Sequence, residues 1–86
     1  MKVHFHKRLA KDFLRLDSMA KDTFESRIEL FIVNPYDIKL NNHPLKGKWS
    51  GYRSINISGD LRALYKEISE EEFIFTNIGS HSQLYG

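Results

Sequence analysis

The sequence contains no cysteine and no long apolar run. Without cysteine the chain has neither a disulfide scaffold nor a thiolate metal site, and it suits a reducing compartment. The N-terminal segment lacks the apolar stretch of a signal peptide, and nothing approaches the length of a membrane span. We therefore expect a cytoplasmic protein without membrane contact.

A large excess of charge of one sign is also missing. The formal net charge is +2 and the isoelectric point is near 9.0, which permits a polyanionic partner without requiring one. With 86 residues, of which 41% are hydrophobic and 28% charged, the chain has room for one domain and one core. We expect a single folded domain over residues 1–86, because there is no repeat and no low-complexity segment.

The first half of the chain has mainly helical periodicity. Val3 and Phe5 alternate with two histidines, which predicts a short half-buried strand. Apolar residues at helical spacing then predict a first helix whose apolar stripe is Leu9, Phe13, Leu16 and Ala20. A second helix, capped by Asp22 or Thr23 and ending near Val33, has an apolar side made of Phe24, Ile28, Phe31 and Ile32. Two helices joined this closely predict an antiparallel hairpin.

The second half has the period of two that is typical of strands. Arg53, Ile55 and Ile57 alternate with Tyr52, Ser54 and Asn56, and turn residues follow at 58–60. Two more strands are expected over 61–68 and 73–79. The order β-α-α-β-β-β predicts a small α+β domain, in which an antiparallel sheet carries the helical hairpin on one face. The other face stays free for water or a ligand.

Two blocks of the sequence carry motifs with a specific order and spacing. Residues 43–66 read HPLKGKWSGYRSINISGDLRALYK, and residues 79–86 read GSHSQLYG. These blocks resemble the YafQ-like branch of the RelE/ParE toxin superfamily, whose pattern is close to HPL-x-G-x-W-x-GYR, an aspartate before a strand ending in YK, then G-[ST]-H and a terminal aromatic-glycine. The resemblance implies a RelE-like fold and the toxin of a type II toxin–antitoxin system. It further implies cleavage of mRNA at the ribosome and an acidic antitoxin that covers the active face.

The resemblance also implies site residues. In YafQ-like toxins the catalytic face carries histidines, an aspartate and a terminal aromatic, which correspond by position to His43, Asp60, His81 and Tyr85. Asn56 stands where the best-known pattern has a further histidine, so this face loses one titratable group. Arg62 resembles an arginine of the wider RelE pattern that faces the RNA phosphate.

Metal-independent cleavage of RNA requires a base for the 2′-hydroxyl, cations for the phosphorane and an acid for the departing oxygen. Histidine, with a pKa of about 6.5, suits either proton role. We expect His81 to be the acid and either His43 or Asp60 to be the base, with a purely structural turn role open for both candidate bases. No cofactor and no metal are expected, since His4 and His6 lack further ligands at a suitable spacing.

Cations and rings near the motif are candidates for RNA binding. We expect the uncovered sheet face to gather Arg53, Arg62, His81 and the lysines around Trp49, where arginine suits phosphate through its planar fork. Lys46 and Lys48 beside Trp49 provide the mixture of charge and stacking surface that suits RNA. A core position for Trp49 and a plug role for Tyr85 on the sheet edge are the structural alternatives.

Two other functions stay open. A ParE-like gyrase poison would share the fold, although that branch is not expected to carry His43, Asp60 and His81 together. A non-catalytic antitoxin-binding module is the second alternative, and Asn56 is the feature that favours it.

Overall fold

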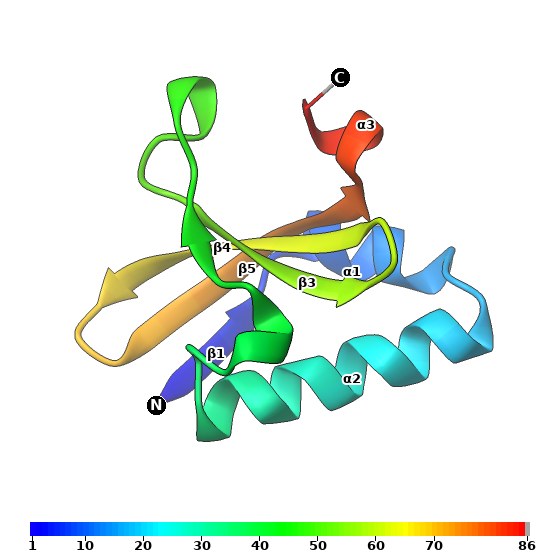
Figure 1. Cartoon of the computed structure of the whole chain (residues 1–86), viewed down its shortest axis with the longest axis horizontal. Helices are drawn as coiled ribbons and strands as arrows, with labels where there is room; N and C mark the ends of the chain where they lie inside the picture. Colours follow the sequence, from blue (N-terminus) through cyan, green and yellow to red (C-terminus); the bar gives the residue numbers. More distant parts are fainter. Residues whose placement is uncertain (86) are drawn as a thin grey trace.

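The computed structural model describes residues 1–85 and has the predicted α+β architecture (Figure 1). The elements in chain order are β1 (Lys2–Phe5), α1 (Lys7–Leu14), α2 (Ser18–Val33), the 3-10 turn η1 (Ile38–Leu40), β2 (His43–Pro44), the 3-10 turn η2 (Gly47–Trp49), β3 (Arg53–Ser58), β4 (Leu61–Ser69), β5 (Glu72–Ser80) and α3 (His81–Tyr85). The expected β-α-α-β-β-β order is confirmed, and β2 and α3 add to it. No helix within the described residues is long and apolar enough to cross a membrane.

The sheet has five strands in the order β1-β5-β4-β3-β2. The β3, β4 and β5 strands are antiparallel neighbours as predicted, but β1 runs parallel to β5. The sheet is therefore mixed, and the expectation of a wholly antiparallel sheet is wrong for this strand. A parallel neighbour needs a long connection, and the chain supplies one because both long helices and three strands separate β1 from its partner.

The second helix begins earlier than the sequence predicts. Asp17, and not Asp22 or Thr23, caps α2, because its side chain accepts a 2.8 Å hydrogen bond from the Ala20 N–H. Such a cap satisfies one of the amide groups that the first helical turn leaves free. The apolar stripe that looked like one longer helix is thus divided between α1 and α2.

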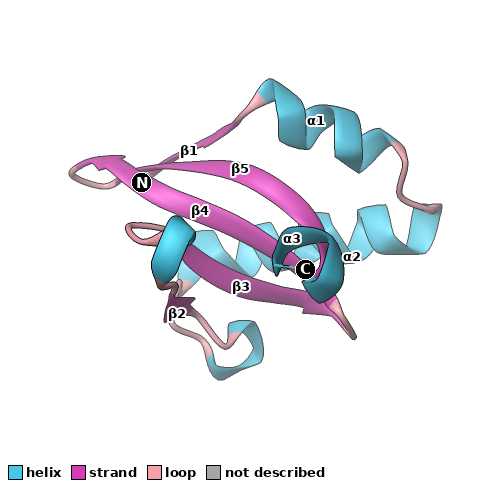
Figure 2. Cartoon of the chain, turned by 90° about the horizontal axis from the view of Figure 1, so that it is seen from above, coloured by secondary structure: helices cyan, strands magenta, loops and turns pink. Residues whose placement is uncertain are grey.

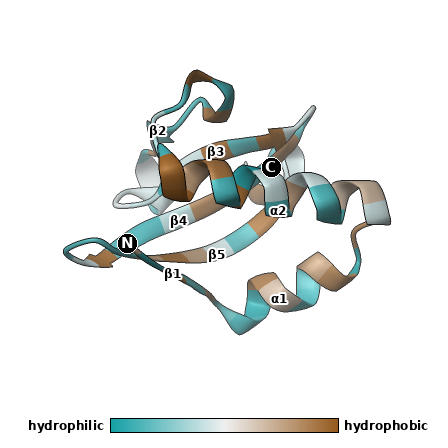
Figure 3. Cartoon of the chain, turned by 90° about the horizontal axis from the view of Figure 1, so that it is seen from below, coloured by the Kyte–Doolittle hydropathy of each residue, from teal (hydrophilic) through white to brown (hydrophobic). Residues whose placement is uncertain are grey.

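The two helices cover one face of the sheet, where α1 packs on β5 and α2 on β3 (Figures 2 and 3). The core beneath them consists of Leu9, Phe24, Ile28, Phe31, Leu40, Ile55, Ile57, Ala63, Tyr65, Phe75 and Ile78. The ring of Phe31 is fully buried and meets Tyr65 edge-on at 4.8 Å. Ile32, expected on the apolar side of this helix, is 46% exposed because it lies one position beyond the buried stripe.

Strand register decides which side chains serve this core. Residues paired across neighbouring strands lie on the same face, so Ile55, opposite Ala63, belongs to the helix-covered side. Asn56, opposite Arg62, belongs to the other side. Ser54 also lies on that uncovered side, where it pairs with His43 of β2 and Leu64 of β4. The uncovered face therefore carries a row of polar side chains.

Candidate functional site

A polar cleft of about 420 Å³ opens on the face away from the two long helices. It is lined by Asn41, His43, Leu45, Lys46, Trp49, Ser54, Arg62, His81 and Tyr85. These residues come from the β2 region, the following loop, β3, β4 and α3, which the sheet brings together from distant parts of the chain. Most of the site residues expected from the sequence meet here, and Asn41, Leu45 and Ser54 are additions that the sequence analysis did not nominate.

The structure fixes the orientation and the tautomer of His43. Its Nδ1 lies 2.7 Å from the backbone carbonyl oxygen of Asn41. A carbonyl oxygen can only accept, so Nδ1 carries the hydrogen and donates it. The lone pair of the neutral ring is then on Nε2, which is the form that can take a proton from a substrate.

His81 and Tyr85 lie on one side of α3, four residues apart. Their rings meet at 4.8 Å with an interplanar angle of 63°. Reciprocal hydrogen bonds hold the start of this helix: the Ser80 N–H donates to Gln83 Oε1 at 2.8 Å, and the Gln83 N–H donates to Ser80 Oγ at 3.2 Å. This capping box makes the C-terminal segment a short folded helix, which the sequence analysis did not predict.

Gly79 lets α3 fold tightly against the end of β5. A Cβ added at this glycine would lie 3.0 Å from Gln83 Oε1 and 3.4 Å from Gln83 Cβ. Any larger residue would therefore press on the side chain that caps α3. The S-x-x-Q spacing from Ser80 to Gln83 is a sequence signal for this helix start, and it was available without the structure.

Trp49 joins the loop wall of the cleft to α3. Its indole Nε1 donates to the backbone carbonyl of Leu84 at 3.3 Å, while its ring meets Tyr52 edge-on at 5.3 Å. The indole is half-buried and lines the cleft, so it is neither a core residue nor a freely exposed stacking platform. The indole forms part of the cleft wall, and its hydrogen bond to Leu84 holds the C-terminal helix in position.

Arg62 presents a positive charge to the cleft from β4. One of its terminal nitrogens, Nη1, donates to the Gly59 carbonyl at 2.8 Å, which anchors the guanidinium to the β3–β4 turn. Within residues 1–85 no carboxylate forms an ion pair with this arginine. The charge is therefore available to an anion, and the planar group has further N–H donors for it.

Arg53 does not share this face. Its Nε donates to Asn42 Oδ1 at 2.8 Å, and its guanidinium lies 5.5 Å from the centre of the Tyr36 ring. Being opposite Tyr65, it lies on the helix-covered side with Ile55. The expectation that it gathers beside Arg62 is wrong, because strand alternation separates the two arginines.

Two further candidates lie outside the cleft lining. Asp60 is exposed in the turn between β3 and β4, directly after Gly59, whose positive φ of 44° suits a tight turn. Its turn holds Arg62 through the Gly59 carbonyl. Lys48 is exposed in η2, one residue from Trp49.

The two N-terminal histidines have structural partners. His4 Nε2 lies 2.6 Å from Glu72 Oε2, and His6 Nδ1 accepts the Arg8 N–H at 3.0 Å as the cap of α1. Hydrogen bonds to Ser69 and, as the second-largest effect, to His4 hold the pKa of the Glu72 carboxyl below its ordinary value of 4.5. In the described part of the chain no three His, Asp or Glu side chains gather in a way that could hold a metal ion.

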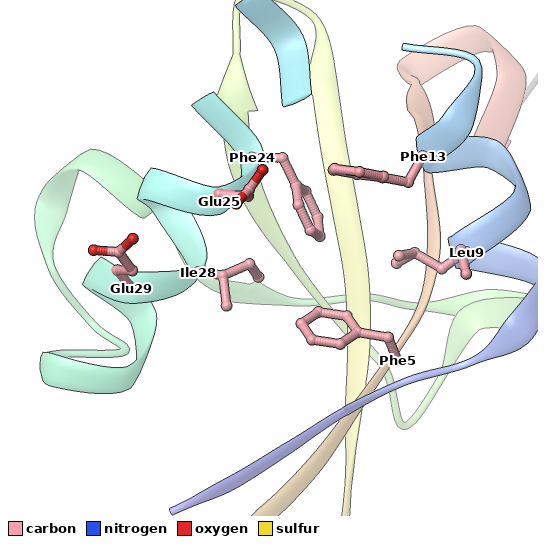
Figure 4. A pocket seen from close by; sticks show the side chains of 8 residues that line it. Phe5, Leu9, Phe13, Phe24, Glu25, Ile28 and Glu29 are labelled. Carbon is pink, nitrogen blue, oxygen red and sulfur yellow. The ribbon is translucent and has the colours of Figure 1, made fainter. Parts of the chain in front are cut away.

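A second hollow lies between α1 and α2, and it is apolar (Figure 4). It has a volume of about 430 Å³ and is lined by Phe5, Leu9, Ala10, Phe13, Phe24, Glu25, Ile28 and Glu29. The rings and aliphatic side chains point into it, and its only charged lining residues are the two glutamates. Negative charge without any cation repels phosphate, so this hollow does not suit a phosphate-bearing ligand.

Comparison with known proteins shows the family to which the chain belongs. The family model described as bacterial toxin of type II toxin–antitoxin system, YafQ, matches residues 1–86. The chain belongs to the YafQ family of bacterial toxins. It is 26% identical to the putative toxin YafQ of Haemophilus influenzae, over 96% of this chain and 90% of that protein. It is also 26% identical to the mRNA interferase toxin YafQ of Escherichia coli strain B / BL21-DE3, over 98% of this chain and 95% of that protein.

Solved structures of YafQ toxins have the same fold. YafQ from E. coli BL21(DE3) superimposes with a TM-score of 0.82 at 24% identity, covering 99% of this chain and 98% of that one. The toxin of the E. coli DinJ–YafQ toxin–antitoxin complex gives a TM-score of 0.79 at 25% identity, over 99% of this chain and 97% of that chain. The predicted membership of the YafQ-like branch and the RelE-like fold are thus confirmed.

The capping box makes a testable contribution to the site. Replacing Gln83 with Ala removes the bond from the Ser80 N–H and should weaken the start of α3 by about 1 kcal/mol, the usual net contribution of one hydrogen bond. Since Trp49 is the one tryptophan and its indole donates to α3, we expect its fluorescence emission to shift to longer wavelength. Gln83→Glu keeps an acceptor at the same place and should resemble the wild type. An unchanged spectrum for Gln83→Ala would show that the cap does not hold the Trp49–Leu84 contact.

Proposed function

We propose that this YafQ-family toxin is an endoribonuclease that cleaves mRNA on the ribosome, through the 2′-hydroxyl and without a metal ion. The observation that carries the proposal is His43, whose Nδ1–H bond to Asn41 leaves Nε2 as a base in the cleft that also holds Arg62 and His81. The name mRNA interferase, given to the E. coli relative, supports it.

In the proposed reaction each proton has a carrier. His43 Nε2 accepts the proton of the 2′-hydroxyl, and the 2′-oxygen forms a bond to the adjacent phosphorus. Arg62 donates to the phosphate oxygens while their negative charge grows. His81, as imidazolium, gives a proton to the 5′-oxygen as its bond to phosphorus breaks. The products are a 2′,3′-cyclic phosphate and a 5′-hydroxyl.

The remaining candidates take supporting roles. Tyr85 packs its ring on His81 and can orient the acid, while Lys46 and the indole of Trp49 border the path of the RNA strand. Asp60 acts through its turn, which anchors Arg62, and we assign the base to His43 because the Asp60 carboxylate does not line the cleft. Lys48, exposed beside the cleft wall, adds positive charge for the phosphate backbone. Arg53 acts only indirectly, by holding Asn42 near His43.

The reaction predicts the chemistry of the RNA ends. After brief induction in a bacterium, mRNA should carry new 5′-hydroxyl ends, and upstream fragments should end in a 2′,3′-cyclic or 3′-phosphate. Cleavage of a model RNA should persist in a chelator, since no step uses a metal ion. A 3′-hydroxyl product, or loss of activity in the chelator, would point to a metal-bound water instead. Arrest of DNA synthesis with intact mRNA would favour the gyrase-poison alternative.

The histidine roles predict large losses of rate. His81→Ala and His43→Ala should each lower the rate of cleavage at least ~10²-fold, the low end for a positioned acid or base. The fold should survive, because His81 is exposed and His43 lies outside the hydrophobic core. The control is His4→Ala, an exposed histidine paired with Glu72, which should cleave like the wild type. Full toxicity of either cleft variant at equal protein level would remove that residue from the mechanism.

We propose that an acidic antitoxin covers the cleft. The DinJ–YafQ complex shows that a toxin of this fold is paired with an antitoxin, and the unpaired charge of Arg62 offers a contact for a carboxylate. An arm that folds on binding needs a wide contact to offset its ordering entropy.

Arg62→Ala should therefore weaken both RNA cleavage and antitoxin affinity, because both ligands would use the same cation. Affinity can be measured by calorimetry at two salt concentrations, since charge contacts weaken with screening. Lys39→Ala changes an exposed cation outside the cleft and serves as the control. Lost cleavage with unchanged antitoxin affinity would show that the antitoxin binds elsewhere.

A further inference from the structure

The uncovered face of β3 carries two buried polar atoms that have no hydrogen-bond partner, and the residue of one of them, Ser54, lines the cleft. They are Ser54 Oγ and Asn56 Oδ1, and within residues 1–85 no other buried side-chain nitrogen or oxygen is left unpaired. Ser54 is only 1% exposed. A buried polar atom without a partner costs folding free energy, and such atoms are few in native proteins. In native proteins an ordered water or a ligand usually completes the bonds of such atoms.

Their position relates them to the candidate chemistry. Both side chains point to the uncovered face of β3, two residues apart. Ser54 is paired with His43 on β2, and Asn56 is paired with Arg62 on β4. The unpaired atoms thus occupy the strip of sheet between the proposed base and the proposed phosphate-binding cation.

The chemistry of these atoms fits the sugar of RNA. A serine hydroxyl can donate one hydrogen bond and accept others, whereas an amide oxygen only accepts. The ribose 2′-hydroxyl is both a donor and an acceptor, and it is the group that distinguishes RNA from DNA. A fully ionised phosphate only accepts, so it would pair with the Ser54 hydroxyl but not with an amide oxygen.

We propose that Ser54 contacts the 2′-oxygen that attacks the phosphate, an inference that rests on the proposed nuclease function. The Ser54 hydroxyl donates to the 2′-oxygen while His43 Nε2 takes the 2′-hydroxyl proton. The freed electron pair forms the new bond to phosphorus, and Ser54 keeps its own proton throughout. Asn56 Oδ1 accepts a hydrogen bond from a neighbouring donor group of the same RNA strand. The contact strengthens as negative charge grows on the 2′-oxygen, so it acts on the rate more than on binding.

Ser54 Oγ is buried, so an incoming ribose reaches it only when side chains of the cleft walls move. One wall of the cleft is a loop and the other is the short helix α3. A 3.3 Å hydrogen bond from the Trp49 indole to the Leu84 carbonyl joins them. The side chains of Lys46 and His81 above the floor are exposed, so an incoming ribose meets long or surface groups that change rotamer easily.

The first test separates a substrate contact from a structural role. Ser54→Ala removes an unpaired hydroxyl, so its melting temperature should equal or exceed that of the wild type. On ribosomes programmed with a short mRNA, its kcat should fall on the order of 10²-fold, as for loss of one donor to a developing oxyanion, with little change in KM. Ser54→Thr keeps the hydroxyl and should retain most of the activity. Ser58→Ala, an exposed serine at the end of the same strand, is the matched control.

A second measurement identifies the contacted atom. An mRNA with a single 2′-deoxy nucleotide at the cleaved position should inhibit wild type and Ser54→Ala equally, because the partner of Ser54 is absent from it. Three results for Ser54→Ala would each overturn the inference. They are a rate of cleavage equal to that of the wild type, a lower melting temperature, or a lower affinity for the deoxy mRNA.

Failure of the nuclease proposal itself gives a different result. If the wild type cleaves neither free nor ribosome-bound RNA, the all-ribose mRNA stays intact and its affinity can be measured directly. A preference for ribose over the single deoxy nucleotide in the wild type, lost in Ser54→Ala, would still support the contact. A preference for ribose that Ser54→Ala keeps at the wild-type level would refute it.

Discussion

Alternation of side chains along β3 and β4 is the constraint on which both the core and the cleft depend. Each strand sends successive residues to opposite faces, so one strand packs against α2 through Ile55 and lines the cleft through Ser54. A slip of one residue would exchange these two and expose the core while burying the polar row. The apolar face therefore fixes the register, and the register in turn positions the chemistry of the other face.

Much of this arrangement is visible in the sequence, because periods of 3.6 and two are local properties of the chain. The element order and most core residues follow from them. Two features do not. The pairing of β1 with β5 depends on which edge a distant strand reaches, and the break before α2 depends on Asp17 competing with Asp22 and Thr23 as a cap. Both are decided by tertiary contacts and cap geometry rather than by periodicity.

The candidate site was foreseeable in part. Family motifs nominated His43, Arg62 and His81, which the sheet brings into one cleft. They did not reveal which nitrogen of His43 carries the hydrogen, since that depends on the Asn41 carbonyl next to it in space. The sheet face on which Arg53 lies could have been predicted from the sequence. Its alternation with Ile55 already placed it on the covered face, and the charge argument alone had grouped it with Arg62.

The core of the domain does not depend on the two unpaired polar atoms of the uncovered sheet face. Stability comes mainly from the other face, where Phe31 meets Tyr65, Phe73 and Phe75. That cluster does not use the cleft residues, so the domain can leave Ser54 Oγ and Asn56 Oδ1 unpaired without losing its core. Local rules of satisfied polar burial are usually broken where a ligand completes them. The two long helices do not cover this face of the sheet. Unpaired polar atoms can therefore wait for a ligand here without disturbing the packing of the core.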